Sequence, residues 1–349
     1  MKTFVLVDFA NLAHRCKHVT MGDAATKAGM ALHICFNSFR QVWRKFGANH
    51  IVVCLEGRSW RRDVYPDYKA HRRVQAALKT RSEREDDEFY FEVMNRFTEF
   101  LSERTNVTVL QQDGVEGDDL VARWIDLHPA DSHVILSSDS DFYQLLAPNV
   151  TIYDGIKSWT ITPEKVLDEK DQPATKSKTV KEKIELKNGK TKEVKKIIIE
   201  SVQPPHPEYE LFKKIVRGDA TDNIMSANPG VLEKGSKKKP GIIQAFADRH
   251  DRGFIWNDFM QREWVDHEGN TIRVLDAYKR NENLINLRLQ PDNVKDLMDV
   301  AIVAAVQKPQ QTGVGIWFLR FCNEMDLHNI AKNPKEYAEF LTVGYSKPD

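Results

Sequence analysis

Short apolar segments that end on an acidic residue recur along the first half of this 349-residue chain. The segments FVLV, IVVCL and HVIL precede, respectively, Asp8, Glu56 and an SSDSD stretch that holds Asp139 and Asp141. Helical patterns alternate with these segments from residue 3 to about 155, which predicts the α/β class, with a mostly parallel central sheet flanked by helices. Ligands of such sheets bind outside the carboxyl ends of the strands, so we expect the acids to gather at one edge.

The stretch 113–146 concentrates this pattern. Glu116, Asp118 and Asp119 open an amphipathic helix, and Asp139 and Asp141 follow the next buried strand. Carboxylates brought together there would repel one another by ~3 kcal/mol per pair at roughly 6 Å and an effective dielectric of ~20. A bland alternative exists, because acids also cap helices and form turns without any further role. Recurrence of the arrangement elsewhere in the chain favours a cation site.

Composition narrows the class of protein. The formal net charge is zero, so overall charge indicates no partner. The four cysteines form no CxxC pair, which argues against a disulfide framework and a zinc site. No apolar run approaches the length of a membrane span, and Asp8 interrupts the N-terminal hydrophobic stretch. We expect a cytoplasmic protein with no membrane association and, from its length, more than one domain.

A basic segment follows Glu56. Residues 58–84 hold nine Lys or Arg against three acids, interleaved with aromatic residues. Cations such as Arg61 and Arg62 can pair with phosphates, and flat rings can stack on bases. We expect Lys69 and Arg72, which lie beside tyrosines, to contact phosphate, whereas other charges in the run can belong to a solvated face.

Residues 164–207 look inserted, because they are lysine-rich and bounded by prolines. Two β-like runs flank Asn188-Gly189, a strong hairpin signal, and the window 174–199 carries nine Lys against three acids. Two interpretations stay open: a solvated, charged hairpin, or a clamp on the backbone of a nucleic acid duplex.

The last part of the chain, 208–349, is predicted to be helical. A helix ending at Gly218 is followed by Asp219 and Asp222, a further acidic group beside a helix end. The sequence NPGVLEKGSKKKPG then separates two helical patterns and predicts a helix-loop-helix element that binds duplex phosphates. Its predicted contacts are Lys237, Lys238 and Lys239.

The collected acids come from five separate places in the alternating chain: Asp8, Glu56, Glu116, Asp118, Asp119, Asp139, Asp141, Asp219 and Asp222. A carboxylate-rich set that lacks histidine and cysteine suits hard cations such as Mg²⁺ or Mn²⁺. With phosphate-binding cations nearby, it predicts two-metal hydrolysis of phosphodiesters.

Five motifs in order resemble those of the 5′-nuclease (flap endonuclease) family, including its bacteriophage members with ribonuclease H activity. They are VLVDFANL, WRR followed by PDYKAHR, VEGDDLVA, ILSSDSDFYQLL and VRGDATDNI, within residues 3–307. The resemblance implies a PIN-like 5′-nuclease core at 1–163 with a basic arch or gateway at 58–88. The inserted hairpin at 164–207 and the helical region at 208–349 would follow.

The resemblance also implies roles for individual residues. Lys69 and Arg72 would lie on the arch, grip the scissile phosphate and stabilise transition-state charge, and Tyr68 would stack on the terminal base. Two Mg²⁺ ions, replaceable by Mn²⁺, would be bound. The first would lie among Asp8, Glu56, Asp118 and Asp139 with Glu116 nearby, and the second would be held, directly or through water, by Asp141, Asp219 and Asp222.

Two departures from the family pattern stand out. Glu56 occupies a position that usually holds Asp, so its contact with metal can be direct or through water. The lysine-rich loop replaces a compact glycine-rich one, which puts the family's potassium site in doubt.

The sequence therefore predicts a Mg²⁺-dependent 5′ to 3′ exonuclease or flap endonuclease acting near 5′ ends of DNA or RNA:DNA duplexes and flaps. Primer removal in phage DNA replication, inside the infected host cell, is the expected setting. We expect a monomer that can contact a single-stranded-DNA-binding replication protein. Two alternatives stay open: a PIN-type endoribonuclease, and a catalytically silent flap- or duplex-binding protein.

Overall fold

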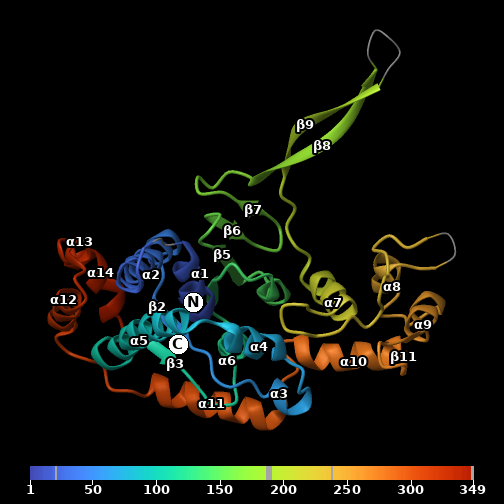
Figure 1. Ribbon diagram of the computed structural model, residues 1–349. Helices are drawn as coiled ribbons and strands as arrows, with labels where there is room; N and C mark the ends of the chain where they lie inside the picture. The colour runs from blue at the N-terminus through green and yellow to red at the C-terminus, as the bar shows by residue number, and fades with distance from the viewer. Residues whose placement is uncertain (20–21, 186–190, 237–238, 347–349) are drawn as a thin grey trace.

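A seven-stranded sheet forms the centre of the computed structural model, which describes residues 1–19, 22–185, 191–236 and 239–346 (Figure 1). Its strand order is β3-β2-β1-β4-β5-β6-β7, with the first five strands parallel and the last two antiparallel. The strands are β1 (Thr3–Asp8), β2 (His50–Cys54), β3 (Thr108–Leu110), β4 (Ser132–Leu136), β5 (Val150–Asp154), β6 (Trp159–Ile161) and β7 (Val166–Leu167). The prediction of a mostly parallel sheet is confirmed.

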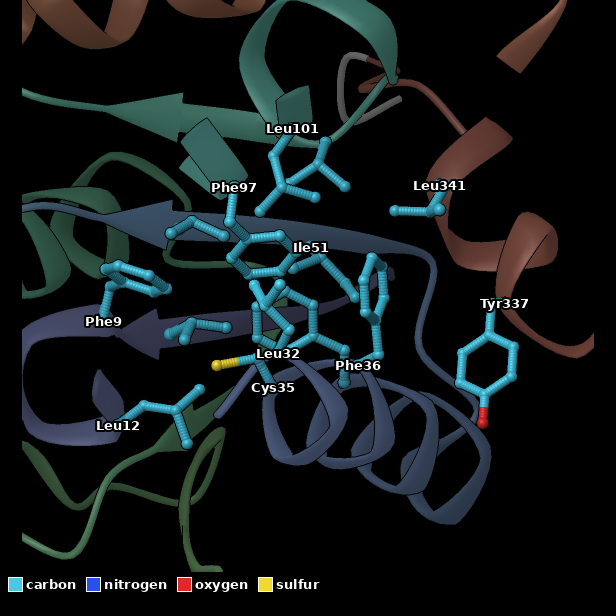
Figure 2. Close-up of a cluster of buried hydrophobic side chains, with 14 of the residues drawn as sticks. Phe9, Leu12, Leu32, Cys35, Phe36, Ile51, Phe97, Leu101, Tyr337 and Leu341 are labelled. Carbon is cyan, nitrogen blue, oxygen red and sulfur yellow. The ribbon is translucent and has the colours of Figure 1, made fainter. Parts of the chain in front are cut away.

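The central strands are buried on both faces, which explains their continuous apolar sequence. In β1, Val5 and Val7 belong to the core on one face, and Phe4 and Leu6 to the core on the other. The helices before β4 are α1 (Phe9–Val19), α2 (Ala24–Phe46), α3 (Arg61–Val64), α4 (Ala70–Leu78), α5 (Arg81–Arg104) and α6 (Gly117–Leu127). The first core lies against α2 and α5 (Figure 2), and the second against α6.

Local signals fix the two long helices. The side chain of Asp23 accepts a hydrogen bond from the amide of Thr26 at the start of α2, and Gly47 ends this helix in the left-handed conformation. Thr80 and Glu83 form a capping box at the start of α5. The acidic stretch at 83–88 is therefore the first turns of a helix.

The chain after the sheet contains the ribbon of β8 (Thr175–Glu185) and β9 (Thr191–Ser201), and then helices from α7 onward. These are α7 (Pro207–Arg217), α8 (Ile242–Ala247), α9 (Phe254–Met260), α10 (Val274–Ile285), α11 (Asp292–Val306), α12 (Val314–Glu324), α13 (His328–Ala331) and α14 (Pro334–Thr342), with a small β10 (Glu263–Val265) and β11 (Thr271–Arg273) pair. A 3₁₀ helix, η1 (Ser140–Leu145), stands where FYQLL predicts a helix.

The helical region 208–349 divides between two places. Helices α7 to α10 share smaller apolar clusters of their own, around Phe212 and around Tyr68. Helices α11 and α12 to α14 instead complete the two cores of the sheet domain, through residues such as Met298, Phe318 and Phe340. All four cysteines lie in the described part of the chain and are buried as free thiols. Of the helices in the described ranges, none is long and apolar enough to cross a membrane.

Candidate metal centre

The sheet register brings three of the predicted acids to one edge. Asp8 ends β1 and is paired with Cys54, two residues before Glu56, while Val7 is paired with Leu136, three residues before Asp139. Because β1 lies between β2 and β4, the chain leaves the sheet in different directions on its two sides. Such a switch point is where open α/β sheets bind ligands.

A close backbone approach brings Glu116 to the same edge. The amide of Gly57 donates to the carbonyl of Val115 at 2.9 Å. A Cβ atom at position 57 would lie only 2.2 Å from the carbonyl oxygen of Gln112, so the approach requires glycine. The amide of Gly117 also donates to Glu56 Oε2 at 3.3 Å, which ties the end of β2 to the start of α6.

Glu116 is buried and surrounded by donors. Its Oε2 accepts hydrogen bonds from Ser59 Oγ at 2.8 Å, Arg61 Nη1 at 2.8 Å and the Tyr68 hydroxyl at 2.9 Å. Its Oε1 forms an ion pair with Lys69 Nζ. Burial alone would raise the pKa of Glu116, but Arg61 and Lys69 outweigh it and hold this pKa at about 2. The carboxylate therefore stays ionised inside the protein.

Asp8 and Asp118 show the opposite effect. Burial, together with the charge of Asp139, raises the pKa of Asp8 to about 6, although Ser137 Oγ donates to its carboxylate at 2.8 Å. Burial and the neighbouring Asp119 raise the pKa of Asp118 well above its usual range. Carboxyl groups crowded in this way lack positive charge, which a divalent cation would supply.

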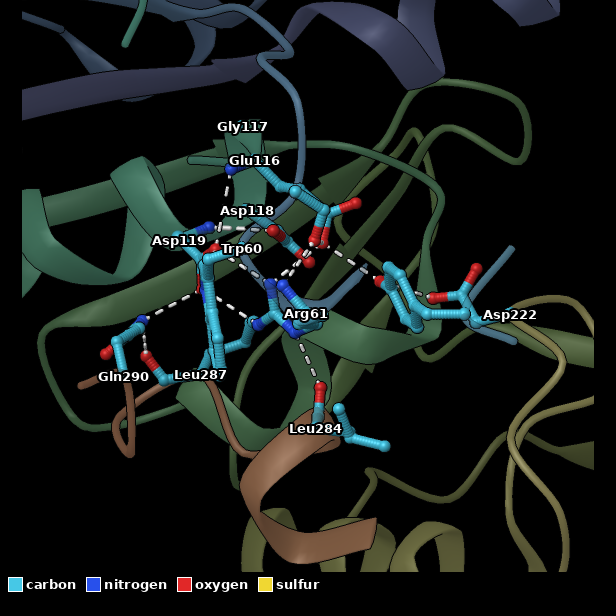
Figure 3. A network of polar contacts seen from close by, with 12 residues as sticks. Trp60, Arg61, Glu116, Gly117, Asp118, Asp119, Asp222, Leu284, Leu287 and Gln290 are labelled. Atoms are coloured by element: carbon cyan, nitrogen blue, oxygen red, sulfur yellow. Dashed lines mark hydrogen bonds and ion pairs between the residues drawn. The ribbon is translucent and has the colours of Figure 1, made fainter. Parts of the chain in front are cut away.

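Asp119 is turned away from this crowd. Its carboxylate accepts from Arg61 Nη1 at 2.7 Å and Nη2 at 2.8 Å, from Trp60 Nε1 at 3.1 Å and from Gln290 Nε2 at 3.1 Å (Figure 3). One oxygen of each of Asp119, Asp118 and Glu116 lies within 4.8 Å of the others, but the donors around Asp119 satisfy both of its oxygens. Asp119 therefore positions Arg61.

This network corrects the prediction that Arg61 contacts nucleic acid. The Arg61 side chain is 1% exposed, and its Nε donates to the carbonyl of Leu284 in α10 at 2.7 Å. Its guanidinium is an internal counter-ion of Glu116 and Asp119, because a distant helix covers it. The spacing of charges in the basic segment contains no sign of that cover.

A second group of acids lies beside α7. Lys214 Nζ forms ion pairs with Asp141 and, at 2.8 Å, with Asp219 Oδ2. Burial and the nearby Asp139 raise the pKa of Asp141 to about 6 even though Lys214 opposes the shift. Lys214 is not among the residues predicted from the sequence, where its only signal is its place on the helix that leads into the acidic loop.

Backbone geometry fixes that loop. Gly218 ends α7 with a φ of 71°, and a Cβ atom there would lie 2.4 Å from the carbonyl oxygen of Ile224. Asp219 and Ile224 exchange two backbone hydrogen bonds, of 2.9 and 2.7 Å, which close the turn that carries Asp222. The acids of this loop are thereby held in place relative to α7.

Asp222 joins the acidic loop to the basic segment. Its Oδ1 accepts from Arg72 Nη2 at 2.8 Å, its Oδ2 accepts from the Tyr68 hydroxyl at 3.0 Å, and its carbonyl accepts from the amide of Lys69 at 2.9 Å. Lys69 Nζ lies 3.9 Å from Asp222 Oδ1. Lys69 and Arg72 therefore lie at the acids. Their contact with phosphate stays a prediction.

Tyr68 requires a second correction. Its ring is 2% exposed and packs with Ile215, Ile224 and Leu284, while its hydroxyl donates to Glu116 and Asp222. A ring enclosed in this way cannot stack on a terminal base. The Tyr68 hydroxyl instead holds the carboxylates of Glu116 and Asp222 in position.

The remaining predicted nucleic-acid contacts have mixed outcomes. Arg62 is half-buried, and its Nε has no hydrogen-bond partner in the described part of the structure. Lys239 is exposed in the tight loop before α8, where the carbonyl of Leu232 accepts from the amide of Ile242 at 3.1 Å. Lys237 and Lys238 lie outside the described residues. For these four residues the predicted roles stay predictions.

Electrostatic interactions link the eight acids predicted to bind metal into one group. Asp8 interacts with Asp139, which interacts with Asp141, and Asp141 in turn with Asp219. On the other side Glu56 interacts with Asp8 and Glu116, Asp118 with Glu116 and Glu56, and Asp222 with Glu116 and Asp219. The negative charge of these carboxylates is only partly balanced by basic side chains, and such a set fits hard divalent cations. Two subsets could hold them, one around Asp8 and Asp118 and one around Asp141 and Asp219.

Comparisons with known proteins place the chain among related nucleases. Residues 3–183 match the family described as 5′-3′ exonuclease, N-terminal resolvase-like domain. Flap endonuclease Xni of Photorhabdus laumondii is 30% identical over 166 residues, covering 46% of this chain and 58% of the relative, and that of Psychromonas ingrahamii is 24% identical over 173 residues, covering 48% and 62%. The chain thus spans less than two thirds of these curated relatives.

Solved structures share the fold. The flap endonuclease of bacteriophage T5, in a pseudo-enzyme-product complex with DNA and metal ions, has a TM-score of 0.54 and 18% identity, covering 97% of this chain and 100% of its own. A T5 5′-exonuclease with bound zinc has a TM-score of 0.52 and 19% identity with the same coverage.

Proposed function

The chain belongs to the 5′-3′ exonuclease family, since the match at residues 3–183 covers more than half of it, and from this premise we propose that it is a metal-dependent 5′ to 3′ nuclease. Its substrates would be DNA or RNA:DNA duplexes with free 5′ ends or flaps. The observation that carries the proposal is the gathering of eight acids from separate loops at the carboxyl edge of the sheet, with Lys69 and Arg72 beside them.

Two Mg²⁺ ions, for which Mn²⁺ can substitute, would be held by these acids. Asp8, Glu56, Glu116, Asp118 and Asp139 surround the first position, and Asp141, Asp219 and Asp222 surround the second. When bound, such ions supply the positive charge that activates water for attack on a phosphodiester and that stabilises the transition state. Whether Glu56 binds directly or through water depends on its extra methylene.

Lys69 and Arg72 would bind the scissile phosphate. Their cationic groups already lie on Glu116 and Asp222, at the border between the two groups of acids. Arg72 is half exposed, with 53% of its side chain accessible, so it can turn to an incoming phosphate without unfolding any element. A guanidinium and an ammonium aimed at the same oxygens stabilise charge that develops during cleavage.

The proposed biological setting of the reaction is phage DNA replication. Ribonuclease H activity in primer removal during phage DNA replication agrees with the order of the sequence motifs. The exposed Lys239 in the loop between α7 and α8 supports duplex contact by the helix-loop-helix region, whereas the same lysine-rich loop speaks against a potassium site of the family type. A monomer in the cytoplasm of the infected cell, in contact with a single-stranded-DNA-binding protein, completes this proposal.

The direct test compares Asp139→Asn with Asp113→Asn on 5′-labelled flap and RNA-primed substrates. Asp113 is exposed in the loop before α6 and serves as the matched control. We expect wild type and the control to release short 5′ products in Mg²⁺ and none in EDTA, and Asp139→Asn to be slower by at least about a hundredfold, as when a positioned transition-state contact is lost.

Other results would change the proposal. Equal rates for wild type and Asp139→Asn would refute the metal assignment. Cleavage of single-stranded RNA without dependence on a 5′ end would favour a PIN-type endoribonuclease. Tight flap binding without turnover in Mg²⁺ or Mn²⁺ would favour a catalytically silent binding protein.

A further inference from the structure

Strands β8 and β9 form a long two-stranded ribbon that projects away from the central sheet (Figure 1). Eleven residue pairs join the strands, from Thr175 opposite Ser201 to Glu185 opposite Thr191. At ~3.3 Å per residue such a ribbon is about 36 Å long. One turn of a nucleic acid duplex has nearly the same length, ~34 Å.

The described side chains of the ribbon do not pack on the body of the protein. At 175–181 and 195–201 all are exposed except Val180 and Glu200, which are half-buried. Ile197 and Ile199 are 71% and 72% exposed. A two-stranded hairpin alone is marginally stable in water, so this segment lacks the burial that normally supports a ribbon of this length.

Its charge is strongly positive. Five lysines stand against the single acid Glu200 among the described side chains of the ribbon, namely Lys176, Lys178, Lys181, Lys195 and Lys196. The register places Lys181 directly opposite Lys195, and like charges in that position destabilise a strand pair. A polyanion bound along the ribbon would meet a row of cations.

The lysines are distributed over both faces of the ribbon. Successive residues of a strand point to opposite faces, so the Lys181–Lys195 pair shares one face with Ile197 and Ile199. Lys176, Lys178 and Lys196 lie on the opposite face. The major groove of a duplex, ~12 Å wide, admits a two-stranded ribbon and presents phosphates on both of its sides. Cations on both faces match that environment.

The base of the ribbon is anchored in the core of the sheet domain, and the chain leads from it into α7. Ala174 is buried in the core, and its carbonyl accepts from the amide of Val202 at 2.8 Å. Six residues beyond Ser201 the chain enters α7, whose Lys214 contacts Asp141 and Asp219. A duplex held on the ribbon therefore lies on the element that leads to the acids.

From these observations we propose that the β8–β9 ribbon binds the double-stranded part of the substrate through its phosphates, away from the bond that is cleaved. That this duplex belongs to a nuclease substrate rests on the proposed function. The binding itself is a separate property of the ribbon, since it requires no divalent ion.

The test combines Lys176→Gln, Lys181→Gln and Lys195→Gln in the full chain. Lys308→Gln, Lys332→Gln and Lys335→Gln, at exposed positions on and between the C-terminal helices, provide a control with the same change in charge. Fluorescence anisotropy with a labelled duplex of about three helical turns in EDTA gives Kd without any cleavage. We expect the ribbon variant to bind about tenfold more weakly near 0.1 M salt, with a slope of log Kd against log salt smaller by about 2 to 3.

Two further variants test whether duplex binding depends on the positive charge of the ribbon or on the particular lysine side chains. Arginine at the same three positions should restore Kd and slope. Excision of 175–201, whose ends Ala174 and Val202 are already hydrogen-bonded, should reproduce the loss while the remaining chain stays folded.

Equal Kd and slope for the ribbon and control variants would overturn the inference. If the two variants bind equally and wild type still cleaves normally, only the proposed role of the ribbon is refuted and the nuclease function stands. Weakened duplex binding by the ribbon variant, in a protein that cleaves nothing in Mg²⁺, would refute the nuclease function and leave the inference standing.

Discussion

The two edges of the central sheet both bury polar side chains, but they do so in different ways. At the amino edge, the ring of His50 lies 2.7 Å from Thr108 Oγ1 and 3.2 Å from the carbonyl of Val343, and His133 lies 3.0 Å from the carbonyl of His128. Burial lowers the pKa of both His50 and His133 to about 4, so these rings are neutral at pH 7. The chain provides partners for both nitrogens of His50 and for Nε2 of His133, whereas Nδ1 of His133 has no hydrogen-bond partner among the described residues.

At the carboxyl edge the polar groups are acids, and the chain provides too little positive charge for them. Arg61 compensates Asp119 and Glu116, and Lys214 compensates Asp141 and Asp219, yet Asp8 and Asp118 keep raised pKa values. The amino edge thus holds neutral rings and needs no added charge, whereas the carboxyl edge has a demand for cations. The difference teaches that buried polar groups can serve the fold alone, as the histidines do, or can also create a demand for a ligand, as the acids do.

The largest effect on stability should follow from Arg61→Met. Its removal leaves Asp119 and Glu116 buried without their counter-ion, and breaking a buried pair in this way costs about 3–5 kcal/mol. Urea denaturation measures the free energy of unfolding. Arg72→Met is the control, because that exposed arginine should contribute less than about 1 kcal/mol. Equal losses for the two variants would show that the buried network is not a structural element.

Lys214→Met should change metal binding at the carboxyl edge. This lysine occupies the space between Asp141 and Asp219 where a cation is expected, so its removal should tighten Mn²⁺ binding by about three- to tenfold, the size of ~0.7 to 1.4 kcal/mol of charge interaction. Isothermal titration calorimetry measures Kd. In Lys213→Met, which removes contacts with Glu210 and the Tyr209 ring, Kd should stay as in wild type. Weaker binding in Lys214→Met would mean that the lysine organises the acids for the metal.

A smaller effect is expected from Tyr68→Phe. The ring stays in its apolar site, but Glu116 and Asp222 lose the one hydroxyl proton that they share, at a cost of about 1 kcal/mol. Thermal unfolding detects this loss. If Tyr68 instead stacked on substrate, phenylalanine would preserve both stability and cleavage. That outcome would restore the predicted stacking of Tyr68 on the terminal base. Tyr65→Phe, on the half-buried neighbouring ring, is the matched control.

The amino edge should affect stability only in acid. His50 and His133 have folded pKa values of about 4, below the ordinary value of 6.5, so between these values the unfolded chain binds more protons. Stability is therefore complete above pH 6.5 and falls as the pH decreases toward 4. His50→Gln should flatten this slope and leave stability at pH 7 nearly unchanged, as urea denaturation at several pH values can measure. The exposed His328→Gln should keep the wild-type slope, and an unchanged slope in His50→Gln would contradict the buried neutral ring.

The sequence by itself predicted the sheet and the places of the acids, because both depend on local signals. Apolar runs buried on two faces are continuous, and an acid directly after such a run must lie at the carboxyl edge of a parallel sheet. Asp8, Glu56 and Asp139 follow this rule, and the register of β1 with β2 and β4 brings them together. Glycines at positions 57 and 218 then fix the approach of Glu116 and the turn of Asp219.

Only the tertiary structure decided which basic side chains pair with acids inside the protein and which are accessible to a ligand. Arg61 and Tyr68 stand in the same basic segment as Lys69 and Arg72, but α10 and α7 cover the first two and leave Arg72 accessible. Lys214 reaches the acids because α7 passes beside η1, and His50 is enclosed because the chain near Val343 returns to the sheet. The physical reason is that burial is set by distant segments, whereas the sequence around a residue determines only its charge and its local conformation.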